Sequence, residues 1–299
     1  MTTPPAHYGY GFVGYQNLHN DIYPAITASI TPALQQPGKV VLVTGAGRGI
    51  GRSIALQYAH ASVAAIVLCA RTSSELDEVA VSIQKINSTI RVHKRPIDVT
   101  KDDAVKTLAQ DVQRDEGRLD ILVNNAGASA PWVHLTASDS SSWWNTFEVN
   151  LKGSYLFLQA FLSLLVLTAE KGNTTVDVVN VSSMGAHVVS PGASAYQISK
   201  LAVLRLSEFV NVEYGAKGVN TVSLHPGGVP TALGTQEESI RPYLIDTAEL
   251  CGGFVVWLTA EPRTWLAGRY VSATWDVDVL ESMRDGIVKE DKLKMFMSV

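Results

Sequence analysis

Short apolar runs alternate with amphipathic stretches along most of the chain, beginning at Lys39. The apolar runs are near-continuous series of Val, Ile and Leu, which is typical of parallel strands covered on both faces. They span residues 39–45, 64–71, 91–99, 119–127, 174–183, 219–226 and 268–273. Amphipathic segments between them, among them 49–62, 102–117, 141–170 and 194–209, are expected to be helices. This alternation predicts an α/β fold, a doubly wound parallel sheet of seven strands with right-handed crossovers.

The same pattern divides the chain into three parts. Residues 1–38 carry Pro, Gly, Tyr and Asn without a sustained period and are interpreted as an N-terminal extension, whose aromatic residues can lie against the body. Residues 39–275 form a single catalytic domain, and residues 276–299 form a C-terminal tail. We find no interdomain linker and no internal repeat beyond the βα rhythm.

Composition and charge narrow the class of partner. Hydrophobic residues make up 46% of the 299 residues and charged residues 17%, which fits a packed globular protein. The formal charge of −4 is too mild for a nucleic-acid or electrostatic membrane partner, so a small-molecule partner is expected.

Cysteine usage and targeting signals bear on location. Cys69 and Cys251 lie in apolar runs, where buried free thiols are favoured over a disulfide, and this suits a reducing compartment. No apolar run approaches the roughly 20 residues that span a bilayer, and the N-terminus lacks the features of a signal peptide. The expected location is cytoplasmic. No metal is expected, because His134 and His225 show no metal-ligand spacing.

The first apolar run continues directly into "TGAGRGIG", residues 44–51, and then into a helix. Gly45 permits a tight turn, Gly49 allows close backbone approach, and Gly51 lets helix and strand pack. The N-terminus of the following helix favours a pyrophosphate. An ordinary strand-to-helix connection is the alternative, but the position after the first strand favours a dinucleotide site.

Four further motifs follow in order. They are "DV" at Asp98–Val99, "NNAG" at 124–127, "SS" at 182–183 before a YxxxK pair at Tyr196 and Lys200, and "PGGVPT" at 226–231. Together with the glycine spacing TGxxxGxG, they resemble the short-chain dehydrogenase/reductase family over about residues 38–275. The resemblance implies a Rossmann fold and an NAD(P)-dependent oxidoreductase, and it leaves both ends of the chain uncovered.

The resemblance also implies a catalytic set. Ser183 matches the catalytic serine, thirteen positions before Tyr196, with the adjacent Ser182 as the alternative. Asn150 matches the asparagine that completes the family tetrad, where it sits at a helix kink and holds a water. Asn150 could instead be a helix-interior residue satisfied by a neighbouring carbonyl.

Cofactor contacts are implied in the same way. Asn125 and Gly127 should line the ribose wall, and Asp98 should meet the adenine with Val99 beside the ring. Thr231 should bond the cofactor near its carboxamide or phosphates. Asp98 could instead cap the helix near Lys101, and "NNAG" could be only a turn. The full expected set is Gly45, Arg48, Gly49, Ile50, Gly51, Arg71, Asp98, Val99, Asn125, Ala126, Gly127, Tyr196, Lys200, Pro226, Gly227, Val229 and Thr231.

Elementary chemistry gives the catalytic residues their roles. A hydride that reaches a carbonyl carbon leaves negative charge on oxygen, so a proton donor and a hydrogen-bond donor are needed there. Tyr196 supplies the proton and Ser183 the second hydrogen bond. Residues at i and i+4 share one helix face, so the ammonium of Lys200 can favour the phenolate of Tyr196.

The second apolar run predicts the choice of cofactor. An NAD site usually places an acid at the end of the second strand, but here the run ends in Ala70 and Arg71. Glu75 comes too late in the chain. Arg71, helped by Arg48 and by the hydroxyl of Thr72 or Ser73, can pair with a 2′-phosphate, although either arginine could be a solvated loop charge. The prediction is NADP(H).

The loops indicate the substrate. Residues 229–246 match the position of a substrate lid in the family, and Trp132, Met184, Val188 and Val189 are expected in the pocket wall. For His187, an ordinary loop position is favoured over a substrate contact. For Trp143 and Trp144, core or subunit packing is favoured over substrate stacking.

The expected reaction interconverts a ketone and a secondary alcohol on a moderately hydrophobic molecule. Both chain ends resemble those of some filamentous-fungal members, which often serve specialised metabolism. An intermediate of such metabolism is therefore one candidate substrate. Two alternatives stay open: an NAD-dependent alcohol dehydrogenase working in the oxidative direction, and a cofactor-binding scaffold or non-redox catalyst. A homodimer or homotetramer is expected, in which the helix with Leu156, Phe157, Leu162, Leu164 and Leu165 and the helix with Tyr196 pack against a partner subunit. The alternative is a helix that is fully buried within one subunit.

Overall fold

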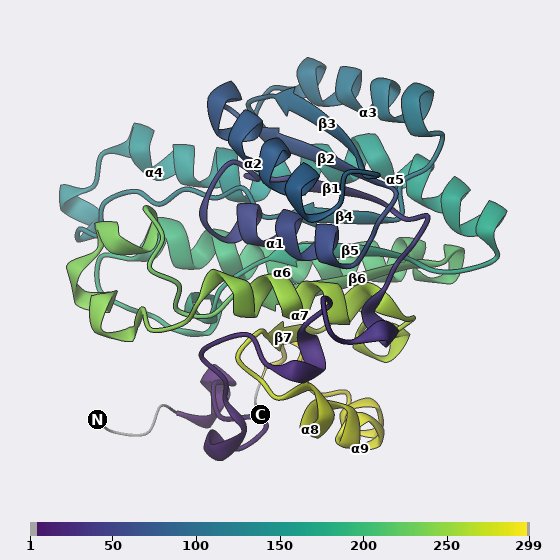
Figure 1. The fold of residues 1–299 in the computed structure, drawn as a ribbon. Coiled ribbons are helices and arrows are strands. Elements are labelled where there is room, and N and C mark those ends of the chain that lie inside the picture. Colours follow the sequence, from purple (N-terminus) through teal and green to yellow (C-terminus); the bar gives the residue numbers. More distant parts are fainter. Residues whose placement is uncertain (1–4, 298–299) are drawn as a thin grey trace.

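The fold is built on one parallel sheet, seen in the computed structural model, which describes residues 5–297 (Figure 1). Its seven strands follow the order β3-β2-β1-β4-β5-β6-β7. The strands are β1 (Val40–Thr44), β2 (Ala65–Ala70), β3 (Arg91–Pro96), β4 (Ile121–Asn124), β5 (Val176–Val181), β6 (Val219–His225) and β7 (Tyr270–Ser272). All pairings are parallel, so the doubly wound sheet expected from the apolar runs is confirmed.

Helices cover both faces of this sheet (Figure 1). The helix α1 packs against α2 and α7 on one face, whereas α3, α5 and the C-terminal part of α6 lie on the other. The α-helices are α1 (Gly49–His60), α2 (Ser73–Ile86), α3 (Asp102–Glu116), α4 (Ser140–Phe147), α5 (Gly153–Gly172), α6 (Ser194–Tyr214), α7 (Ala248–Ala260), α8 (Val277–Ser282) and α9 (Arg284–Lys289). The inner strands are almost wholly buried, which explains why their sequences lack a polar alternation.

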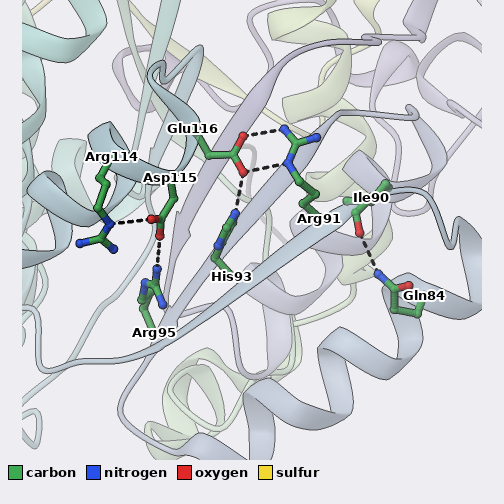
Figure 2. Close-up of polar contacts among 8 residues, drawn as sticks. All are labelled: Gln84, Ile90, Arg91, His93, Arg95, Arg114, Asp115 and Glu116. Atoms are coloured by element: carbon green, nitrogen blue, oxygen red, sulfur yellow. Dashed lines mark hydrogen bonds and ion pairs between the residues drawn. The ribbon is translucent and has the colours of Figure 1, made fainter.

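Polar residues protect the edge strand β3. Arg91 forms two hydrogen bonds to Glu116 at the end of α3, of 3.0 and 2.5 Å, and His93 lies 2.6 Å from the same carboxylate (Figure 2). Arg95 pairs with Asp115 at 2.9 Å. Charged side chains on an edge strand discourage pairing with another chain.

The long helix expected over 141–170 is interrupted in the structure. The π-helical turn Glu148–Lys152 joins α4 to α5, and it contains Asn150. A π-turn adds a residue to the helix and often occurs at functional sites. This π-turn lies at Asn150, the position where the resemblance places a helix kink.

This helix is also the main apolar helix of the chain. By length and composition, Ser140–Gly172 could cross a membrane, but 56% of its most apolar window is buried inside the protein. Such burial is typical of a core helix. It also corrects one expectation: the side chains thought to face a partner subunit are buried within one subunit, namely Leu156, Phe157, Leu162, Leu164 and Leu165.

The extension and the tail pack together beside β7 (Figure 1). The amide of Asp276 in the tail donates to the carbonyl of Asn17 at 3.0 Å, and Leu18 forms an antiparallel bridge with Trp275, directly before the tail. Ile26 of the extension is fully buried in the same hydrophobic cluster as β1. Residues 5–38 are thus an ordered part of the body.

The strand order places the functional loops. Strand β1 has β2 on one side and β4 on the other, so the order of the strands reverses there. In doubly wound sheets, ligands bind outside the carboxyl ends of the strands at this reversal. The loops after β1, β2, β4, β5 and β6 meet at that edge.

Candidate active site

The glycine-rich turn between β1 and α1 can hold a dinucleotide. Gly45 and Gly49 have φ angles of +65° and +54°, which glycine adopts freely. A Cβ at Gly51 would overlap the carbonyl oxygen of Gly45, so the chain requires glycine there. The first turn of α1 has neither an acidic residue nor a side-chain cap, which leaves its N–H groups available to an anion.

The segment after β4 lies directly against this turn. The amides of Asn125 and Ala126 both donate to the hydroxyl of Thr44, at 2.9 and 3.0 Å. The side chain of Asn125 donates to the carbonyl of Thr44 at 2.8 Å. On the opposite side, a Cβ at Gly49 would lie 3.2 Å from the Cγ2 of Thr231. The glycine loop, the 125–127 segment and Thr231 thus surround one space.

Asp98 and Val99 follow β3 and have different environments. Asp98 accepts hydrogen bonds from the amide and hydroxyl of Thr100, at 3.0 and 2.9 Å. Burial alone would raise the pKa of Asp98, but these bonds lower it overall. Helix α3 is not capped by Asp98, since Lys101 is its N-cap residue. Val99 is buried, and a Cβ at Gly153 would lie 2.9 Å from its Cγ2.

The two serines after β5 point to different places. The hydroxyl of Ser182 is buried and donates to the carbonyl of Lys200 at 2.9 Å, so it fixes α6 to the sheet. Ser183 instead lines the large pocket, where its Oγ accepts a hydrogen bond from the amide of Gly185 at 3.0 Å. Of the two serines, only Ser183 can meet a ligand in that pocket.

Tyr196 and Lys200 occupy successive turns near the start of α6. Burial raises the pKa of Tyr196, and a hydrogen bond with the side chain of Ser183 partly offsets this. The Nζ of Lys200 donates to the carbonyl of Val181 at 2.8 Å and lies 5.7 Å from the centre of the Tyr196 ring. Burial lowers the pKa of Lys200 to about 8. Ser183, Tyr196 and Lys200 thus lie together at the end of β5.

Asn150 connects three elements from the π-turn. Its side chain exchanges two hydrogen bonds with the backbone of Ala128, at 2.8 and 3.0 Å, and donates to the hydroxyl of Ser199 at 2.9 Å. Ser199 in turn donates to the carbonyl of Tyr196 at 2.7 Å. Sequence reasoning missed Ser199, because nothing in its local pattern distinguishes it from an ordinary helix residue. Asn150 therefore links the loop after β4 to the helix that carries Tyr196.

Charged residues gather where β2 ends. Arg48 and Arg71 are both exposed there, and Arg71 is close enough to help lower the pKa of Asp98. The expectation that Glu75 comes too late in the chain to reach this site is wrong. A Cβ at Gly47 would lie 2.6 Å from the carboxylate of Glu75, which also pairs with Arg48 at 3.8 Å. Helix α2 turns Glu75 back over the glycine loop.

A pocket of about 530 Å³ opens beside Ser183 and Tyr196. The expected wall residues Trp132, Met184 and Val188 line it, but Val189 does not and is 97% exposed. Residues of the expected cofactor set also line the pocket. The loop after β6 contributes Pro226, Gly227, Val229 and Thr231, and the glycine-rich turn contributes Ile50. Sequence reasoning missed Tyr10, Gln197 and His225 in this wall, whereas Asp246 belongs to the expected lid segment 229–246.

The remaining candidate residues lie elsewhere. His187 is not among the pocket-lining residues and packs edge-on against Tyr270, as expected of an ordinary loop histidine. Trp143 stacks on Phe147 and donates to Ser194 at 3.0 Å. Cys69 and Cys251 are free and buried. Within residues 5–297, no group of three or more His, Cys, Asp or Glu could hold a metal ion.

Comparison with known proteins identifies this arrangement. The family model for short chain dehydrogenases matches residues 39–241. The chain belongs to the short chain dehydrogenase family. This short chain dehydrogenase is 45% identical, over 99% of both chains, to the short chain dehydrogenase mpl6 of the filamentous fungus Monascus purpureus. The family expected from the motifs is confirmed.

Solved structures share the fold. The 3-ketoacyl-(acyl-carrier-protein) reductase of Brucella melitensis, complexed with NADH, superposes with a TM-score of 0.72 at 23% identity, over 80% of this chain and 97% of that one. A short chain dehydrogenase structure from Shigella flexneri, complexed with NADP, gives 0.73 at 23% identity over 81% and 99%. These structures therefore establish the Rossmann fold of this short chain dehydrogenase.

Proposed function

We propose that this short chain dehydrogenase uses NADP(H) to interconvert a ketone and a secondary alcohol on a moderately hydrophobic small molecule. One observation carries the proposal: Ser183 and Tyr196 line the same largely apolar pocket, close enough for the side chain of Ser183 to lower the pKa of Tyr196. Lys200 lies one helical turn further on. A phenol and a hydroxyl that converge on one point suit a carbonyl oxygen that gains negative charge.

The roles follow from this geometry. When bound, the nicotinamide cofactor donates a hydride in reduction and accepts one in oxidation. Tyr196 gives its proton to the substrate oxygen in reduction and takes it back in oxidation, while Ser183 donates a second hydrogen bond to that oxygen. The ammonium of Lys200 favours the phenolate and can hold ribose hydroxyls. Asn150 holds the loop after β4 against α6, and we propose that a water connects it to Lys200.

The cofactor preference is argued from charge. Arg71 and Arg48 offer two cations at the end of β2, where a 2′-phosphate would lie. Glu75 favours the alternative, an NAD-dependent dehydrogenase, because its carboxylate lies beside the glycine loop and pairs with Arg48. We favour NADP(H), because Arg71 forms no salt bridge among residues 5–297, although it lies close enough to Asp98 to lower the pKa of that carboxyl group. The opposing effects of Arg48 and Glu75 on cofactor binding can be distinguished by single substitutions.

The substrate class and the cellular location are proposed from the pocket lining, from sequence similarity and from the free cysteines. The pocket is lined mainly by apolar side chains, which suits a moderately hydrophobic carbonyl compound. The similarity to a fungal short chain dehydrogenase over nearly the whole chain supports a role in fungal specialised metabolism. Two free buried thiols suit a reducing compartment such as the cytoplasm.

Replacing Tyr196 by Phe tests the proposal. The variant Tyr196→Phe removes the proton donor but keeps the ring, so turnover should fall by about 10²–10⁴-fold. NADPH affinity, measured by calorimetry, should stay within a few-fold. The assay follows NADPH oxidation with a panel of ketones and quinones. Turnover above one tenth of the wild-type value would refute the assignment.

A further inference from the structure

The N-terminal extension reaches the pocket that holds Ser183 and Tyr196. Tyr10 is one of the residues that line this pocket, although it lies far from them in the sequence. Its carbonyl accepts a hydrogen bond from the indole of Trp275 at 3.2 Å, and its ring lies 6.0 Å from that of Tyr15. Trp275 is fully buried, so Tyr10 is fixed to a rigid part of the body.

A second contact holds the extension against another part of the pocket wall, at Asp246. Asn20 donates to Asp246 at 2.5 Å, and the other carboxylate oxygen of Asp246 accepts from the amide of Gly228 at 2.6 Å. The carbonyl of Asn20 also accepts from the amide of Thr247 at 2.8 Å. Asp246 itself lines the pocket. One chain of hydrogen bonds therefore holds the extension against the loop after β6.

The hydroxyl of Tyr10 is available to a ligand. Among residues 5–297 this hydroxyl has no hydrogen-bond partner, and Tyr10 is one of the residues that line the pocket. Asp246 is close enough to add to the effect of burial in raising the pKa of Tyr10, so the phenol keeps its proton at neutral pH. A phenol O–H in a largely apolar wall can bind one polar group of a substrate.

We infer that Tyr10 is a specificity-determining residue, which binds an oxygen substituent of the substrate other than its reacting carbonyl. Tyr10 forms part of the pocket wall, and its hydroxyl selects a ketone that carries a hydroxyl group as a second oxygen substituent. Ser183 and Tyr196 hydrogen-bond the reacting oxygen of the substrate, so Tyr10 is left to hydrogen-bond the second oxygen. This inference rests on the proposed function. It adds Tyr10 of the N-terminal extension to the proposed substrate site.

A pair of ketones that differ by one hydroxyl tests the inference. The probes are 1-tetralone and 6-hydroxy-1-tetralone, assayed with saturating NADPH on the full chain. Wild type should favour the hydroxylated ketone. In Tyr10→Phe, KM for that ketone should rise about 3- to 10-fold, with kcat and KM for 1-tetralone unchanged within about 2-fold. In Tyr10→Ala, KM should rise for both ketones, because the wall is lost.

Tyr8 provides the matched control. It lies in the same extension and is not among the pocket-lining residues, so Tyr8→Phe and Tyr8→Ala should leave both KM values unchanged. Equal rises for the two ketones in Tyr10→Phe, or the same rises in the Tyr8 variants, would overturn the inference.

Direct binding separates this inference from the proposed function. If wild type reduces neither ketone, that result counts against the reductase, and calorimetry on the NADPH-loaded protein then decides the role of Tyr10. Tighter binding of the hydroxylated ketone, lost in Tyr10→Phe, supports the inference. Equal affinity of wild type for both ketones overturns it.

Discussion

Burial acts in opposite directions on the two titrating residues of the site. It raises the pKa of Tyr196 and lowers that of Lys200 to about 8, because a low-dielectric environment disfavours the charged form of each. Near neutral pH the phenol therefore keeps its proton and Lys200 is mostly an ammonium. This protonation state suits reduction, in which Tyr196 must give up a proton, whereas alcohol oxidation requires a phenolate.

The proposed cofactor preference depends on Arg71, Arg48 and Glu75. We expect Arg71→Ala to lose most of the preference for NADP(H), because a hydrogen bond to a charged group contributes roughly 1.5–3 kcal/mol, or about 10- to 150-fold. Glu75→Gln should strengthen NADP(H) binding, since it removes a carboxylate that competes for Arg48 and repels a phosphate. Calorimetric titration of each variant with NADPH and NADH measures both changes.

The cofactor measurements need a control variant and a result that would contradict the prediction. Lys85→Ala removes a cation from the far end of the same helix α2 and should leave both affinities unchanged. Equal affinity of the wild-type protein for the two cofactors would show that the NADP(H) prediction is wrong. Tighter NADPH binding by Arg71→Ala would contradict the role of Arg71.

Several motif residues could be placed from the sequence because they lie just after a strand or near the start of a helix. The carboxyl ends of parallel strands meet at one edge, so Ser183 and Asn125 had to lie near the glycine loop. Tyr10, Ser199 and Glu75 could not be placed in this way. Their positions depend on how an extension folds, how a π-turn meets α6 and how the first turn of α2 is directed.

At the scale of elements, the apolar runs predicted the strands well and the long helix only in part. Burial on both faces gives a strand a continuous apolar sequence, and all seven runs became strands. The segment 141–170 reads as one helix, but Asn150 uses its side chain to bind Ala128 and Ser199. A π-turn accommodates this contact, and its cause lies in tertiary structure rather than in local sequence.

Strand β5 carries a buried carboxyl group that should make stability depend on pH. Burial raises the pKa of Asp177 to about 7, although Lys39 and a hydrogen bond from Asn220 at 2.8 Å act against this. Arg263 also lowers this pKa, and Asp120 raises it. The folded-state pKa of Asp177 exceeds its unfolded value. The contribution of Asp177 to the stability of the folded state is therefore fully present below pH ~4 and is lost as pH rises through about 7.

The variant Asp177→Asn should remove this dependence. Near pH 4 its free energy of unfolding should match that of the wild type, and by pH 8 the variant should be more stable by about 2–4 kcal/mol. Urea unfolding at several pH values measures the difference. Asp77→Asn, at an exposed position, serves as the control. A difference between Asp177→Asn and wild type that does not change with pH would contradict the prediction.

At the scale of the whole molecule, the described residues of the extension and of the tail belong to the folded body. The extension packs on β7 and the tail, and it also supplies Tyr10 to the pocket. Composition alone could not show this, because residues 1–38 lack a period that would indicate a strand or a long helix. Short 3₁₀ turns and side-chain contacts with Trp275 hold the segment in place.

A partner subunit is expected to cover one exposed face of α6. Ile198, Leu201, Phe209 and Val212 recur at helical spacing on that face, and Phe209 and Val212 are 57% and 81% exposed. Tyr155 on α5 is 47% exposed, and these two helices contact each other. Exposed apolar patches of this kind mark protein interfaces. The expected assembly is a homodimer or homotetramer formed through these residues.

Replacing the two most exposed residues of this face tests the assembly. The double variant Phe209→Glu and Val212→Glu should shift the wild-type oligomer to a monomer at micromolar concentration, because two carboxylates cannot be buried unpaired in an apolar interface. Static light scattering measures the mass, and circular dichroism checks that the fold persists. Val81→Glu, at an exposed apolar position on α2, should leave the oligomer intact. A wild-type protein that is already monomeric would exclude this interface.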